Sequence, residues 1–89
     1  MDKAEARKIL QRKIEDLQSR GFKALCEFVD APQTFKTMGQ FGAWYHLKVS
    51  VVWDDKSPKA LRVTVVIDDG QGWRIPMTES FIITPSGSV

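Results

Sequence analysis

The chain has 89 residues, of which 43% are hydrophobic and 27% charged, and its formal net charge is +2. This length accommodates one domain, and the composition excludes a disordered chain. No apolar run approaches the roughly 20 residues of a membrane span, and the first residues lack the apolar stretch of a secretory signal. We therefore expect a single domain over residues 1–89, located in the cytoplasm.

Residues 3–19 predict an amphipathic helix. Its apolar stripe has helical spacing and consists of Ala6, Leu10, Ile14 and Leu17. Asp2 and Glu5 are spaced like an N-cap residue and its reciprocal partner. Gly21 suits the left-handed position that follows a helix. The stripe needs an apolar surface to cover.

The basic residues are concentrated near the start of the chain. Residues 1–23 carry seven basic and four acidic side chains, whereas residues 24–89 carry six and seven. Nucleic-acid binding through Lys8, Arg12 and Lys13 is therefore an alternative function. However, Arg12 is spaced to pair with Glu15 and Asp16, so we favour a solvated helix face.

The sequence changes to a two-residue period after the helix. Phe22–Val29 favours a strand, although a short helix fits nearly as well, and the Pro and Gly residues in 30–42 indicate a loop or irregular edge. Alternation predicts strands over 44–54 and 61–68, joined by a turn at 55–58. A turn at 69–72, a strand over 73–77 that Pro76 places at an edge, and a short strand over 81–84 complete the sheet.

These elements predict an α+β fold, in which the N-terminal amphipathic helix packs on a three- to five-stranded antiparallel meander. The sheet extends from about residue 22 to 84, and 85–89 form a flexible tail. Trp53 and Trp73 fall on the inward face and are expected in the core, because a buried indole removes about 150–250 Å² from water. Trp44 falls on the other face.

A loop at residues 55–59 sets the register of the central hairpin. It places Val51 opposite Val63, Val49 opposite Val65, Leu47 opposite Ile67, Ser50 opposite Thr64 and His46 opposite Asp68. His46 and Asp68 are the one acid–base pair that this arrangement offers, and a polar cross-strand contact explains it better than catalysis does. Ser50 lies roughly 13 Å from His46 along the strand and cannot complete a triad. An enzyme using His46 and Asp68 is the weakest of three hypotheses, and we predict no catalytic residues.

We predict no metal site and no cofactor. The steps Asp54-Asp55 and Asp68-Asp69 are turn residues roughly 25 Å apart, too far to share an ion. One Cys and one His cannot form a zinc site. Gly70-Gln71-Gly72 joins two strands, without the helix N-terminus that receives a phosphate. We expect Cys26 to be buried and chemically inert.

The outer face of the sheet is the remaining candidate site. The residues predicted to bind a protein partner there are Trp44, His46, Lys48, Arg62, Asp68 and Arg74. Trp and Arg are enriched at interface hot spots, although a solvated face is an equally good interpretation. We expect a small non-catalytic protein-interaction module of the size of a bacterial inhibitor or immunity-type protein. Stacking of two sheets into a homodimer is a second use of this face. Residues 73–82 are faintly similar to the ends of some small bacterial proteins, but they contain no chemical motif and identify no family.

Overall fold

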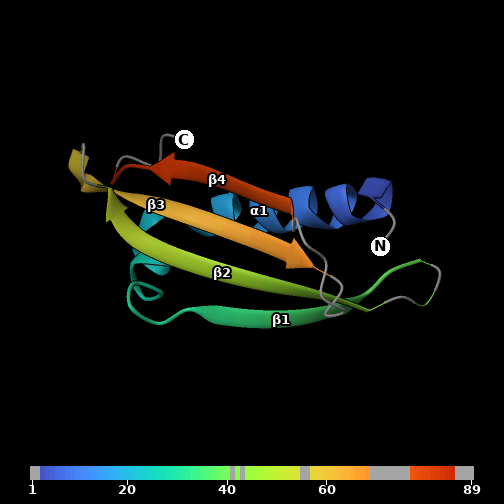
Figure 1. The fold of residues 1–89 in the computed structure, drawn as a ribbon. Helices are drawn as coiled ribbons and strands as arrows, with labels where there is room; N and C mark the ends of the chain where they lie inside the picture. The colour runs from blue at the N-terminus through green and yellow to red at the C-terminus, as the bar shows by residue number, and fades with distance from the viewer. Residues whose placement is uncertain (1–2, 41, 43, 55–56, 69–76, 86–89) are drawn as a thin grey trace.

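The computed structural model describes residues 3–40, 42, 44–54, 57–68 and 77–85, and it shows one helix on a four-stranded antiparallel sheet (Figure 1). This confirms the predicted α+β class. In chain order the elements are α1 (Lys3–Cys26), β1 (Gln33–Met38), β2 (Trp44–Asp54), β3 (Ser57–Asp68) and β4 (Met77–Ile83). The strand order is β1-β2-β3-β4, so each strand pairs with its neighbours in sequence.

Helix α1 buries the predicted apolar stripe and extends seven residues beyond the predicted end. At Gly21 the backbone leaves helical geometry, with φ 85° and ψ 168°, and the helix then resumes as far as Cys26. The strand prediction for Phe22–Val29 is therefore wrong, and the short helix is the correct alternative. Leu25 is fully buried and Phe22 and Phe28 pack against the core, a spacing of three that suits a helix.

Strand β1 lies within residues 30–42, where the sequence predicted a loop or irregular edge. It pairs antiparallel with β2 and places Phe35 opposite Leu47 and Thr37 opposite Tyr45. Its residues alternate between half-buried and exposed along its whole length. Phe35 is the one large apolar side chain that this strand turns inward, which is why its two-residue period is weak in the sequence.

The register of β2 and β3 is confirmed at all five predicted pairs, including Val49 with Val65 and His46 with Asp68. The turn was predicted too long, because the strand already begins at Ser57. Residues 55 and 56 lie outside the described residues. The register shifts between Trp53 and Asp54, because Trp53 pairs with Leu61 whereas Asp54 pairs with Ser57.

Strand β4 is continuous from Met77 to Ile83, where two separate short strands were predicted. Its inward residues follow the expected alternation, because Phe81 pairs with Val63 and Ile83 with Leu61, and all four are buried. The predicted turn at 69–72, residues 73–76 and the last four residues of the predicted tail lie outside the described part of the chain.

The core lies between α1 and one face of the sheet. Helix α1 packs mainly on β3 and β4, and β1 lies at the sheet edge away from it (Figure 1). Leu10 and Leu17 of the helix and Val63 and Val65 of β3 are almost completely buried there.

Trp53 is not a core residue, contrary to the prediction, because 48% of its surface is exposed. It lies at the register shift near the end of β2, and the tilted ring of Phe22, with its centroid 6.2 Å away, shields it only in part. The burial alternation of β2 breaks at this point, and the next residue, Asp54, is buried instead. The predicted burial of Trp73 falls outside the described residues.

Candidate protein-binding face

The sheet surface opposite α1 is here named the outer face. Five of the six predicted binding residues belong to it: Trp44, His46, Lys48, Arg62 and Asp68. Their positions follow from the register and from the alternation along each strand. The residues between them, such as Tyr45 and Leu47, point to the face that α1 packs on and are buried there. Arg74, the sixth, lies outside the described residues.

The outer face is uncovered by every described segment of the chain. Trp44 is 53% exposed and Val52 50% exposed, which are large fractions for apolar side chains within a strand. Residues 33–38 extend the sheet sideways as β1 and do not fold over this surface. An antiparallel sheet with one open face is stable in water, so the exposure needs no further chain to explain it.

Strands β1 and β4 add residues that sequence reasoning missed. Met38, itself 53% exposed, pairs with Trp44, and Lys36 pairs with His46. Ile82 of β4 is 40% exposed and pairs with Arg62. The signal for Ile82 was present in the alternation of 81–84, whereas nothing in 30–42 distinguished the two β1 residues from a loop.

The apolar side chains form two patches at opposite ends of the outer face. One patch is Met38 with Trp44, and the other is Val52 with Ile82, which flank Arg62 in a single row across β2, β3 and β4. Four of the five exposed large hydrophobic residues of the described chain belong to these patches. The apolar exposure is therefore gathered on one face.

The charges on the outer face are mainly positive. Among the described residues, Lys36, Lys48 and Arg62 share this face with one carboxylate, that of Asp68, which is the cross-strand neighbour of His46. Arg62 Nη2 donates a hydrogen bond to Asp54 Oδ1 at 3.1 Å, and the Asp54 side chain is only 4% exposed. Arg62 therefore has a structural role beside any role in binding, because it neutralises a buried carboxylate.

The middle of the outer face is polar. Lys36, His46 and Asp68 form one cross-strand row, and Ser50, Thr64 and Ser80 form another. His46 and Ser50 are four residues apart on the same strand, which agrees with the predicted separation that excludes a triad. Both rows lie on the outer face of the sheet.

The basic helix pairs its charges differently from the prediction. In the described chain the Asp16 carboxylate pairs with Lys13 at 3.7 Å and with Arg20 at 3.3 Å, instead of with Arg12. The Lys13 Nζ atom also lies 3.7 Å from the ring centroid of Phe35. Of the three cations of the alternative nucleic-acid surface, Lys8, Arg12 and Lys13, the last is therefore already paired within the fold.

The remaining candidates for chemistry are dispersed. Cys26 is a half-buried free thiol against the core. Asp54 ends β2 and Asp68 ends β3, so they lie at opposite ends of the β2–β3 hairpin, as predicted, and their neighbours Asp55 and Asp69 fall outside the described residues. Within the described part, no three His, Cys, Asp or Glu side chains converge as metal ligands would. None of the described helices is long and apolar enough to cross a membrane.

None of the family models, curated proteins and solved structures compared with the chain matches it.

Proposed function

We propose that the protein is a small non-catalytic interaction module whose outer face binds the acidic surface of a partner protein. The observation that carries this proposal is the gathering of exposed apolar and cationic side chains on one uncovered sheet face. Trp44 and Met38 supply adjacent apolar area, and Lys48 lies two residues along β2 from His46. Aromatic, Met and Arg side chains are the types enriched in protein interfaces.

The chemistry of the partner follows from the charge of this face. Lys36 and Lys48 project from the same face as the exposed indole of Trp44, so a partner with carboxylates around an apolar contact is complementary. A second copy of the chain would instead bring two faces with an excess of cations together across a two-fold axis, which opposes stacking. A stoichiometric inhibitor of an acidic protein, as in the immunity-type role, is a use that suits this size and surface.

Site-specific photo-crosslinking tests the proposal. The photoreactive residue p-benzoylphenylalanine is placed at Val66, in the centre of the outer face, and in a control at Gln11, on the exposed side of α1. We expect a defined heterologous adduct from position 66 and not from position 11. The crosslinked protein is then purified, and its affinity is measured by titration calorimetry.

The affinity series uses variants that leave the fold intact. Trp44→Ser is expected to weaken binding by about thirtyfold, the effect of losing a hot spot of about 2 kcal/mol. Lys48→Glu is expected to weaken it further, while Lys23→Glu, an equal charge change on exposed α1, has no effect. Arg62 is left unchanged because its loss would leave Asp54 buried without its partner. Equal affinities for all variants, or equal crosslinking from position 11, would refute the proposal.

A further inference from the structure

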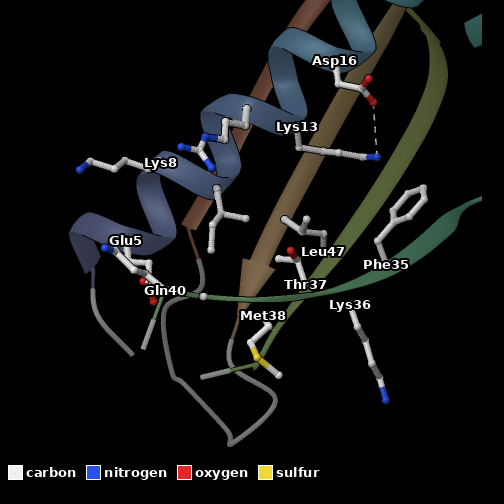
Figure 2. A pocket seen from close by; sticks show the side chains of 13 residues that line it. Glu5, Lys8, Lys13, Asp16, Phe35, Lys36, Thr37, Met38, Gln40 and Leu47 are labelled. Carbon is white, nitrogen blue, oxygen red and sulfur yellow. Dashed lines mark hydrogen bonds and ion pairs between the residues drawn. The ribbon is translucent and has the colours of Figure 1, made fainter. Parts of the chain in front are cut away.

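A groove of about 430 Å³ runs between α1 and the inner side of β1, on the opposite side of the sheet from the outer face. It exists because the helix packs on β3 and β4 and leaves β1 uncovered. Leu47 and Phe35 form part of its apolar lining, and the Lys13 side chain reaches across it to the Phe35 ring (Figure 2). Lys36 and Met38 project from the other side of β1 (Figure 2).

The lining of the groove has more positive than negative side chains. Its two acidic residues are engaged: Glu5 with Gln40 and Tyr45, and Asp16 with Lys13 and Arg20. On the helix side the exposed side chains of Lys8 and Arg12 line the groove and form no ion pair with any described residue. The groove therefore offers two available cations beside apolar surface.

Strand β1 is also an open edge of the sheet, because β2 pairs with one of its sides and no described strand pairs with the other. Natural sheets protect such edges in several ways, among them lysine on the edge strand, which Lys36 supplies on the outer side of β1, and inward-pointing charges. The opposite edge has this protection, since Glu79 of β4 lies on the inner face opposite Val65 and is exposed. The inward residues of β1 are Gln33, Phe35 and Thr37, none of which is charged.

We propose that the β1 edge binds an extended acidic segment of a partner protein as a fifth strand. The backbone of the segment bonds to the free side of β1, and its alternate side chains project to the inner side, toward the groove. Carboxylates at those positions meet Lys8 and Arg12, which is the charge complementarity that selects an acidic segment. This surface is separate from the outer face, so the proposal goes beyond the function proposed above.

A second copy of the chain is a poor occupant of this edge. Pairing two β1 strands around a two-fold axis would bring the cations of both grooves, Lys8 and Arg12, toward each other, and would place Lys36 of each copy on the same face. An acidic segment has no such conflict. Self-association of the chain through this edge would overturn the proposal.

The test uses the full chain and a fluorescein-labelled peptide in which eight residues alternate between valine and glutamate. Fluorescence anisotropy measures its dissociation constant, and amide hydrogen exchange by NMR measures protection along β1. We expect saturable binding, together with new protection of those β1 amides that do not bond to β2. A peptide with alternating valine and lysine is expected not to bind. A valine–glutamate peptide with N-methylated backbone amides cannot form the ladder and is also expected not to bind.

Charge reversal locates the binding on the groove. Lys8→Glu with Arg12→Glu is expected to raise the dissociation constant at least about tenfold, because two attractions become repulsions. The matched control is Arg7→Glu with Lys23→Glu, which makes the same charge change on exposed positions of α1 outside the groove. Three binding results would overturn the proposal: equal weakening by both double variants, equal binding of the N-methylated and unmodified peptides, or no binding of any peptide. A dimer in sedimentation that the peptide cannot dissociate would also overturn it.

Discussion

At the scale of single residues, the Glu5 carboxylate connects the start of α1 to the β1–β2 connection. It accepts a hydrogen bond from the Gln40 backbone N–H at 2.7 Å and another from the Tyr45 hydroxyl at 2.8 Å. Tyr45 is fully buried, so its hydroxyl would be costly to leave without an acceptor. A cap role for Glu5 was predicted from its place in the first turn, but no local pattern indicates partners thirty-five and forty residues away.

Removing the Tyr45 hydroxyl should therefore destabilise the fold. Tyr45→Phe is expected to lower the free energy of unfolding by about 1.5–3 kcal/mol, the range for a hydrogen bond to a charged group. Urea denaturation followed by circular dichroism measures the change. In a Glu5→Gln background the same substitution should cost less, because the acceptor is no longer charged. Equal losses in both backgrounds would show that the hydroxyl and the carboxylate are not coupled.

At the scale of elements, Gly21 decides where the long helix bends. Its φ of 85° and ψ of 168° lie in a region that is essentially restricted to glycine. Added side-chain volume is not the obstacle, since nothing lies within 4 Å of the place a Cβ would take. The bend lets Phe22 approach Trp53 and Leu25 enter the core.

Alanine at this position distinguishes a bend from a regular helix. In a regular helix Gly→Ala gains up to about 1 kcal/mol, whereas we expect Gly21→Ala to lose about 1–3 kcal/mol because of backbone strain. Thermal and urea unfolding measure the sign. Gln11→Ala, at an exposed position within the same helix, serves as the control and should change stability by less than about 0.5 kcal/mol. A stabilised Gly21→Ala variant would contradict the bend.

The elements differ in how far local sequence determines them. In strands β2 and β3 apolar and polar residues alternate over many positions. One assumed loop therefore determined which residues lie on each face and which pair across the strands, such as Leu47 with Ile67 and Val51 with Val63. The register shift after Trp53 is not predictable, because the alternation continues without a break through residues 51–54 in the sequence. Strand β1 was missed because Phe35 alone provides its apolar signal, and its pairing depends on a neighbouring strand.

At the scale of the whole molecule, the sheet register determines the candidate site more than any motif does. Trp44, Lys48 and Arg62 were placed correctly on the outer face because one hairpin register orders them all. Met38 and Lys36 could not be assigned to this face without knowing that residues 33–38 form a strand. Whether this face binds a protein remains the proposal that the crosslinking experiment tests.

The charge distribution predicts how the chain associates with itself. Because Lys36 and Lys48 project from the outer face, stacking of two sheets is opposed most strongly when salt screening is weak. We expect sedimentation velocity to show a monomer at about 50 mM salt, where the repulsion between two outer faces is least screened. A dimer at low salt that Trp44→Ser dissociates would contradict this expectation and identify the outer face as a self-association surface.

The position of β1 has a consequence for how the native state fluctuates. One strand holds it and α1 leaves it uncovered, so few buried apolar contacts are lost when it separates from β2. Local opening of β1 therefore requires less free energy than global unfolding, and α1 with β2, β3 and β4 can stay folded meanwhile. From the helix, the Lys13–Phe35 contact and the hydrogen bond from the Gln40 N–H to the Glu5 carboxylate oppose this opening. The edge strand that we propose to bind a segment of a partner is thus also the first strand of the sheet to separate from its own neighbour, β2.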